Sequence, residues 1–331
     1  MTHQPIVLTS GEPAGIAPDI TAAAWQALKG RAASCFFLLG DADYWQSRNP
    51  SLPVRRIQSP REAKDVFAEA LPVLHRPLDA APVAGKLHPA TAKQVISAID
   101  EAVSMAFDGT VSAIVTNPIQ KEALYTAGFR HQGHTDYLAH LAETRGHKAQ
   151  EVMMLVAADL RAIPVTVHIP LSEVPKQLTG ASIMAQASVA AEALTRHFGI
   201  AQPRLAFTGL NPHAGENGTM GTEENAIIIP ALKELAAQGY SVQGPLPADT
   251  AFHPEARAQY DAILCMYHDQ ALIPVKTLDF HGGVNVSLGL PFIRTSPDHG
   301  TALSIAGTHT ANPKSLIAAL TLAAQMAKTA S

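Results

Sequence analysis

Short runs of aliphatic and β-branched residues alternate with longer alanine-rich stretches of helical periodicity along most of the 331 residues. This alternation is typical of βα units, in which a crossover helix returns the chain to a neighbouring parallel strand. Strands are predicted at 6–9, 35–39, 111–116, 151–157, 163–168, 204–208 and 262–266. Helices are predicted at 17–28, 89–107, 181–198, 223–238 and 313–328. We therefore expect an α/β fold with a largely parallel sheet.

The composition excludes several classes of protein. Hydrophobic residues make up 47% of the chain, which is too much for a disordered protein. Lys and Arg number 24 against 28 Asp and Glu, so a net charge of −4 provides no positive field for nucleic acid or an anionic membrane. The start of the chain lacks a basic segment followed by an apolar one, and no run approaches the ~20 apolar residues of a membrane span. We expect a cytoplasmic protein with neither nucleic acid nor membrane as partner.

Three histidines each end a predicted strand or follow it directly: His168, His213 and His268. In an open α/β sheet the carboxyl ends of parallel strands meet at the edge where ligands bind. Three imidazoles at that edge supply nitrogen ligands for a divalent ion and leave coordination positions for a substrate. Any one of them alone is better interpreted as a strand-end residue with its own hydrogen bonds. The three together favour a metal site.

The last third of the chain adds donors for an anion. Lys276, Asn285 and Arg294 are each predicted near an extended segment that aims them at one site. Together they offer fixed donors to a phosphate or a carboxylate, and Arg adds its planar fork. The alternative is solvated charge at a rim, which is the usual fate of Lys and Arg. The surrounding Gly, Pro and apolar residues favour the binding interpretation.

Two further segments have structural interpretations of their own. The sequence TSGEPAG at 9–15 follows the first predicted strand, and we interpret it as a tight strand-to-helix turn rather than a phosphate cradle. In GHTD at 133–136, Thr135 is predicted to cap a helix over 136–145, while His134 is free to face an anionic group.

Read together, the motifs resemble the 4-hydroxythreonine-4-phosphate dehydrogenase family of pyridoxal phosphate biosynthesis. The matching strings are GEPAGIAPD, TNPIQK, GHTDYLA, VHIP, GLNPHAGENGTMGTEE, GPLPADT, MYHDQ and GVNVSLGLPFIRTSPDHGTALSIAG, and they span nearly the whole chain. The resemblance implies metal ligands at His168, His213 and His268. It also implies substrate contacts from His134, Thr135, Lys276, Asn285 and Arg294.

The family's fold is similar to that of the isocitrate and isopropylmalate dehydrogenases. It implies two α/β/α lobes, one from residues 1–130 plus 305–331 and one from 131–304, with the active site in the cleft between them. It implies a homodimer whose active site lies at the subunit interface, with metal ligands donated partly by the neighbouring subunit. It further implies one divalent cation per site, which is Zn, Mg, Co or Mn.

The string DHGTALSIAG at 298–307 is similar to the nucleotide-binding loop of those enzymes. It therefore implies that NAD or NADP binds near His299, Gly300 and Thr301, although the chain has no GxGxxG motif. The implied reaction oxidises the C3 hydroxyl of a small phosphorylated hydroxy-amino acid, 4-phosphohydroxy-L-threonine. The resulting β-keto acid loses CO₂ to give 3-amino-2-oxopropyl phosphate. Asp249 is a candidate base or orienting residue, and an Asx-turn role after Pro is an equally good interpretation.

Three alternatives stay open. A similar subfamily oxidises four-carbon sugar-acid phosphates such as threonate 4-phosphate, and Asp136 stands where the family often has Glu. Three histidines with an open position also suit a metal-dependent hydrolase, for which Asp249 or Asp269 would be the base. A non-catalytic ligand-binding protein with two lobes is the third alternative, although so many convergent titratable groups favour an enzyme.

Overall fold

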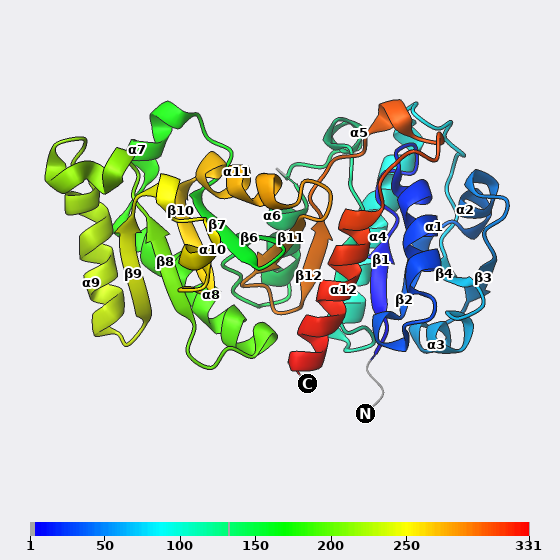
Figure 1. Ribbon diagram of the computed structural model, residues 1–331. Coiled ribbons are helices and arrows are strands. Elements are labelled where there is room, and N and C mark those ends of the chain that lie inside the picture. Colours follow the sequence, from blue (N-terminus) through cyan, green and yellow to red (C-terminus); the bar gives the residue numbers. More distant parts are fainter. Residues whose placement is uncertain (1–3, 132, 331) are drawn as a thin grey trace. The chain divides into compact units, whose positions relative to one another are not determined.

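The strands of this computed structural model, which describes residues 4–131 and 133–330, belong to two α/β units (Figure 1). The first unit comprises Met1–Glu151 and Leu290–Thr329, and the second comprises Val152–Gly289. The predicted α/β class is confirmed. The units differ from the expected lobes, because 131–151 and 290–304 belong to the first unit. In that unit the helix at 134–143 packs against the helix at 92–107, and the strand at 294–297 pairs with the strand at 114–116.

The strands of the first unit run parallel in the order β3-β4-β2-β1-β5-β12. Their bounds are β1 Ile6–Thr9, β2 Phe36–Gly40, β3 Val54–Ile57, β4 Leu71–His75, β5 Ile114–Thr116 and β12 Arg294–Pro297. Every residue of β1 and β2 is buried, so helices cover these strands on both faces.

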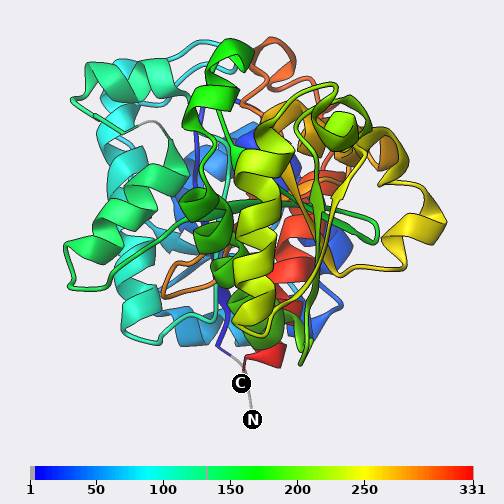
Figure 2. The ribbon, with the colours of Figure 1, turned by 90° about the vertical axis from the view of Figure 1, so that its left-hand side faces the viewer.

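The helices of the first unit are α1 Ala17–Leu28, α2 Ala42–Arg48, α3 Ala63–Val66, α4 Ala92–Phe107, α5 Lys121–Thr126, α6 His134–Glu143 and α12 Lys314–Thr329. Helices α1 and α12 pack against each other and α12 contacts β12, whereas α4 packs on β1, β2 and β5 from the other side (Figure 2). The apolar face of α4 that Val95, Ile99 and Val103 form is buried, as its helical spacing predicts.

The strands of the second unit have the order β11-β6-β7-β10-β8-β9. Their bounds are β6 Val152–Ala157, β7 Leu160–Thr166, β8 Arg204–Thr208, β9 Ser241–Leu246, β10 Ala262–Tyr267 and β11 Val284–Leu288. The pairs β11–β6 and β6–β7 are antiparallel, whereas β7, β10, β8 and β9 are parallel neighbours. The parallel part therefore carries its carboxyl ends along a single edge.

The helices of the second unit are α7 Val174–Gln177, α8 Gly180–Phe198, α9 Ile229–Ala237, α10 Pro254–Arg257 and α11 His268–Leu278. Helix α11 contributes Ala271 and Val275 to a core that includes Ala162 of β7 and Cys265 of β10. Helix α8 also packs on β6 and β7, and Thr179 caps it by accepting a hydrogen bond from the Ser182 backbone N–H. Among the described residues, no helix combines the length and the apolar character that crossing a membrane requires.

Candidate active site

The three histidines singled out in the sequence follow three adjacent parallel strands of the second unit. His168 lies just after β7, His213 lies in the turn after β8, and His268 is the first residue of α11, directly after β10. Strand β10 pairs with β7 on one side and with β8 on the other. The topology thus brings all three histidines to one edge of this sheet, as expected for strand-end residues in a βα fold.

His168 and His268 lie side by side, with ring centroids 5.6 Å apart. The Nδ1 atom of His268 lies 2.7 Å from Oδ1 of Asp269, which leaves Nε2 for a metal ion. A carboxylate on the far ring nitrogen is the arrangement that orients histidine ligands in metal sites. The donor set therefore suits a divalent cation. Within residues 4–131 and 133–330, no set of three metal-ligating atoms within 4.8 Å of one another includes these histidines, so His213 does not complete a cluster within one chain.

One set of metal-ligating atoms within 4.8 Å of one another does occur in the described part of the first unit, at Asp41, Asp43 and His75. Hydrogen bonds account for this proximity. Asp41 caps α2 by accepting from the backbone N–H groups of Asp43 and Tyr44. Nδ1 of His75 accepts the Ala42 N–H at 3.1 Å, and Asp43 pairs with Arg56 at 2.6 Å. These hydrogen bonds form the capped start of α2, and they explain why the three side chains lie close together without a metal.

Two predicted substrate residues lie on other elements of the second unit. Lys276 was expected near an extended segment, and this is wrong, because it lies on α11. The helix was not predicted from the sequence because it contains Pro274, and proline normally ends a helical pattern. The Lys276 ammonium lies 5.5 Å from the ring centroid of Phe280. Asn285 is on β11, and its buried Oδ1 accepts no hydrogen bond from the described residues.

His134 and Thr135 are the first two residues of α6 in the first unit. Gly133 is the residue that precedes the helix, and it provides no side-chain cap. The prediction that Thr135 caps a helix beginning at 136 is therefore wrong. The backbone N–H groups of an uncapped first turn favour a negative charge. The carboxylate of Asp136, the third residue, lies 3.2 Å from Nδ1 of His131.

Cationic side chains surround this helix start. Arg294, on β12, is 3% exposed and donates from Nη2 to Thr116 Oγ1 at 2.7 Å. Burial lowers the pKa of Arg294 to about 10, against the opposing effect of the nearby Glu151 carboxylate. Burial, together with the charges of Arg294 and Lys121, holds the pKa of His134 well below its usual range, so this imidazole is neutral at pH 7. Its buried Nε2 lacks a hydrogen-bond partner among the described residues.

Lys121 is a candidate residue that the sequence analysis did not single out. Its ammonium lies beside the start of α6, since a Cβ added at Gly133 would be 4.0 Å from Lys121 Nζ. The only signal for it in the sequence is its place at the end of the TNPIQK string. We call His134, Thr135, Lys121, Thr116 and Arg294 the anion group, because they combine two cations with donors at a helix start.

Comparison with known proteins shows to which family a chain with these three histidines and this anion group belongs. Residues 32–323 match the family described as pyridoxal phosphate biosynthetic protein PdxA. A relative from Caulobacter vibrioides, named 4-hydroxythreonine-4-phosphate dehydrogenase, is 51% identical over 99% of this chain and 98% of its own length. The chain belongs to the PdxA family. It is thus an enzyme of the dehydrogenase class in pyridoxal phosphate biosynthesis.

Solved structures agree with the membership. The 4-hydroxythreonine-4-phosphate dehydrogenase of Klebsiella pneumoniae is similar to this chain with a TM-score of 0.87 and 37% identity, covering 98% of this chain and 99% of that one. A terephthalate 1,2-cis-dihydrodiol dehydrogenase from Burkholderia xenovorans is similar with a TM-score of 0.66 and 28% identity, with 98% of each chain covered. The fold of the PdxA family therefore occurs in dehydrogenases named for different substrates.

The loop that resembles a nucleotide-binding loop is bound to the first unit by hydrogen bonds. Thr301 donates to Gln120 Oε1 at 2.9 Å, and its carbonyl accepts the Ile16 N–H at 3.0 Å. The Ala14 N–H is bound by the Glu12 carboxylate and the Gly15 N–H by the Glu12 carbonyl. These N–H groups after β1 are thus used within the chain, which confirms a turn rather than a phosphate cradle. His299 is partly buried and Gly300 is exposed.

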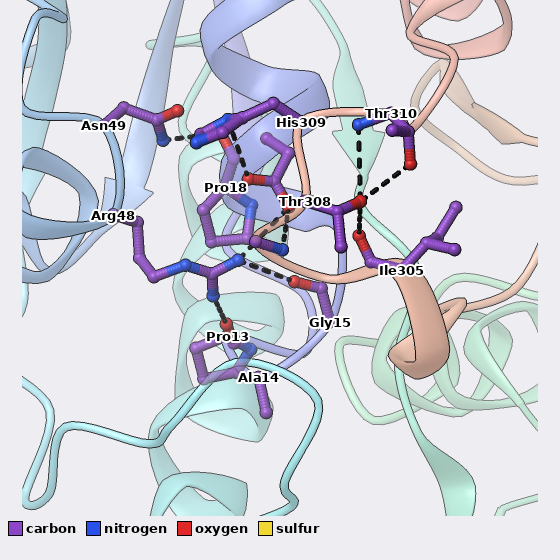
Figure 3. Close-up of polar contacts among 12 residues, drawn as sticks. Pro13, Ala14, Gly15, Pro18, Arg48, Asn49, Ile305, Thr308, His309 and Thr310 are labelled. Carbon is purple, nitrogen blue, oxygen red and sulfur yellow. Dashed lines mark hydrogen bonds and ion pairs between the residues drawn. The ribbon is translucent and has the colours of Figure 1, made fainter.

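A buried ion pair fixes the far end of this loop. Arg48 Nη2 lies 3.1 Å from Asp19 Oδ2, with the two side chains 10% and 3% exposed. Figure 3 shows Arg48 also donating to the backbone oxygens of Pro13 and Gly15, at 3.0 and 3.4 Å. Asp19 accepts the Gly307 N–H at 2.9 Å, so the same carboxylate holds the loop and the start of α1. His309 lies 3.6 Å from its other oxygen.

We expect Arg48→Met to lower the free energy of unfolding by about 3 kcal/mol, because it leaves the buried Asp19 carboxylate without its cation. Urea denaturation measures this loss. Arg56→Met is the matched control, since Arg56 pairs with Asp43 at the surface with 49% of its side chain exposed, and we expect it to change the stability little. Equal stability of the two variants would contradict a structural role for the Arg48–Asp19 pair.

The two candidate bases line one cavity of the second unit. Asp249 lies in the turn after β9 and Asp269 in the first turn of α11, and both contribute to a cavity of about 370 Å³. Its lining also includes Tyr267 and Phe252, together with Ile273 and Leu278 of α11. Both carboxylates are exposed to solvent. Asp269 differs from Asp249 in its direct contact with His268.

Proposed function

We propose that this chain oxidises 4-phosphohydroxy-L-threonine at C3, with NAD or NADP as hydride acceptor and a divalent cation held by His168, His213 and His268. The product is 2-amino-3-oxo-4-phosphooxybutanoate, which loses CO₂ to give 3-amino-2-oxopropyl phosphate. The observation that carries the proposal is the placement of three histidines at the carboxyl ends of the adjacent strands β7, β10 and β8. The proposed oxidation fits the dehydrogenase class to which the family belongs.

The anion group supports a phosphorylated substrate. Arg294 and Lys121 provide positive charge, and the start of α6 provides backbone donors, beside a neutral His134 whose Nε2 is available. A phosphate dianion accepts several such hydrogen bonds at once, and each charge-assisted bond contributes about 1.5–3 kcal/mol. Residues that hold the phosphate fix the substrate and so help to align C3 for hydride transfer. Lys276 and Asn285 remain the proposed contacts to the other polar groups of the substrate.

The histidine edge supports the redox step. When bound, the cation makes the C3 hydroxyl more acidic and the nicotinamide takes up the hydride. The protein must then accept the hydroxyl proton, and the carboxylates of Asp249 and Asp269 are the candidates at the cavity beside α11. Asp269 also keeps the His268 ring in the tautomer that presents Nε2. In the proposed reaction C3 would give a hydride to the nicotinamide and the hydroxyl oxygen would give its proton to the protein, and the carbanion that loss of CO₂ leaves at C2 would then take up a proton.

We further propose a homodimer in which a neighbouring subunit completes the metal site. Two features support it. No set of three metal-ligating atoms in the described part of one chain contains the three histidines. Helix α11 and the turn after it expose large apolar side chains, with Ile273 64%, Leu278 37% and Phe280 68% exposed. Apolar groups gathered on one surface mark contacts with another chain.

A side-by-side assay tests the proposal. Purified protein with a defined cation and NAD or NADP is given 4-phosphohydroxythreonine or threonate 4-phosphate, and formation of reduced nicotinamide is followed. We expect turnover with the first substrate, release of CO₂, and loss of activity after chelation. A tenfold or greater preference for threonate 4-phosphate in kcat/KM would instead assign the enzyme to the sugar-acid phosphates. Release of inorganic phosphate without nicotinamide reduction would favour a metal-dependent hydrolase.

A further inference from the structure

The turn that carries His213 has an unusual backbone. Residues 213–217 all have positive φ, with values of 52° for His213, 51° for Ala214, 78° for Gly215, 40° for Glu216 and 58° for Asn217. L-residues other than glycine rarely adopt this left-handed region, and a run of them does not persist by itself. Contacts from outside the turn must therefore hold it in this form.

Glu224 makes those contacts. Its side chain is buried, with 2% of the residue exposed, in a π-helical turn at Glu224–Ile228. Oε1 accepts the backbone N–H groups of Leu210 and Asn211, both at 2.8 Å, and Oε2 accepts Asn211 Nδ2 at 3.0 Å. The carboxylate thus binds the segment that leads from β8 into the turn.

The same carboxylate also packs directly against the turn. A Cβ added at Gly215 would lie 2.4 Å from Glu224 Oε2, and one added at Gly209 would lie 3.1 Å from Oε1. A Cβ at Gly209 would also lie 2.7 Å from Ala214 Cα. Glycine at these two positions therefore lets the backbone close around the carboxylate. The conformation of the left-handed turn therefore depends on its packing against Glu224.

We infer that Glu224 is a positioning residue for His213: its buried carboxylate holds the left-handed turn that presents this imidazole at the edge of the sheet. The inference rests on the proposed role of His213 as a metal ligand. Glu224 binds the backbone N–H groups that lead into the turn and packs against Gly215, so we expect it to act on the metal only through His213.

The hydrogen-bond pattern requires a carboxylate at this position. Asn211 Nδ2 donates to Oε2 of Glu224 and also to Oε2 of Glu223, at 2.7 Å. In Glu224→Gln one oxygen becomes an amide donor that faces the Asn211 amide. Rotation of Asn211 by half a turn would satisfy that donor but would place its oxygen against the Glu223 carboxylate. One of the two contacts is therefore lost in the glutamine variant, although the size of the side chain is kept.

The test measures Co²⁺ binding to the purified full-length protein by calorimetry and by the visible absorption of the bound ion. We expect Glu224→Gln to weaken Co²⁺ binding by about 10- to 100-fold, as the loss of groups that orient a ligand does. We expect the double variant Glu224→Gln/His213→Ala to bind Co²⁺ as His213→Ala alone does, within about twofold, because Glu224 acts only through that ring. Glu234→Gln, the same change on the exposed face of α9, is the matched control and keeps the wild-type affinity.

Hydrogen exchange of the metal-free protein gives a second readout. The amides of Leu210 and Asn211 donate to Glu224, so we expect them to exchange faster in Glu224→Gln, while the amides of β8 keep their protection. Gly215→Ala reaches the same contact from the turn and supplies a second variant should Glu224→Gln fail to fold. It is expected to weaken Co²⁺ binding in the same direction.

The outcomes separate this inference from the proposed metal site. Wild-type Co²⁺ affinity in folded Glu224→Gln or folded Gly215→Ala, with His213→Ala impaired, overturns the positioning role and leaves the ligand role of His213 intact. Additive losses in the double variant overturn it too, because they show an effect that bypasses His213. Wild-type affinity in His213→Ala overturns the ligand role, and the inference falls with it.

Discussion

Replacement of His268 by alanine is expected to weaken binding of the divalent cation by more than about 100-fold and to lower kcat/KM at least as much. His268 lies beside His168, and the Asp269 carboxylate on its Nδ1 orients the ring so that Nε2 is presented to a metal. Loss of an orienting group alone costs about 10- to 100-fold, and loss of the ligand itself costs more. Titration of the metal-free variant with Co²⁺, followed by turnover at saturating cation, measures both effects.

His253→Ala is the control for His268→Ala. His253 is in the same unit, its side chain is 53% exposed, and its Nδ1 lies 2.8 Å from Glu255 at the surface. We expect this variant to bind the cation and to turn over as the wild type does. Wild-type metal content and activity in His268→Ala would contradict the metal site.

Mixing variants tests whether the metal site is shared between subunits. If a neighbouring chain supplies part of the ligand set, two inactive variants such as His268→Ala and His213→Ala regain part of the activity when their subunits exchange. One of the two sites in such a mixed dimer then contains both substitutions, and the other contains neither. Absence of any recovery, with mixed dimers verified by mass spectrometry, would place His213 and His268 of one metal site in the same chain.

The helices and strands predicted best from the sequence are those whose buried side chains are apolar. Strands β1 and β8 and helix α1 have the predicted bounds, because the two strands contain runs of three buried apolar residues and the helix follows a clear periodicity. Strand β12 escaped prediction, since its residues Arg294–Pro297 are buried but mostly polar. Hydrogen bonds to distant segments hold two of these side chains, from Arg294 to Thr116 and from Thr295 to the carbonyl of Ala319, and such bonds leave no periodic signal in the sequence.

The residues of the candidate site likewise include some that the sequence predicted and some that it did not. That three histidines share one sheet edge follows from their position after predicted strands, and the order of β7, β10 and β8 agrees with it. Lys276 was misplaced because Pro274 interrupts the helical pattern. Lys121 and Glu224 were not singled out, since their surroundings depend on pairings between distant segments. The positive φ angles of Ala214 and Glu216 could not be predicted from the sequence either, because neither residue type favours this conformation.

Substitution of Arg294 by methionine is expected to raise KM for a phosphorylated substrate by about 10- to 150-fold, with a smaller effect on kcat. The estimate corresponds to losing one charge-assisted hydrogen bond of about 1.5–3 kcal/mol. The expected cause is local, since Arg294 is 3% exposed in the anion group and its guanidinium donates to Thr116. Methionine keeps much of the apolar volume, and steady-state kinetics with denaturation of each variant separates binding from folding.

Comparison of two substrates decides whether Arg294 binds the phosphate. With 4-phosphohydroxythreonine the wild type should exceed Arg294→Met strongly in kcat/KM, whereas with unphosphorylated 4-hydroxythreonine the two should perform alike, because the group that the arginine binds is then absent. Arg294→Lys keeps the charge but loses the planar fork, so an intermediate KM is expected. Arg55→Met, on the exposed face of β3, is the control. An equal loss with both substrates would show that Arg294 binds another part of the substrate or only supports the fold.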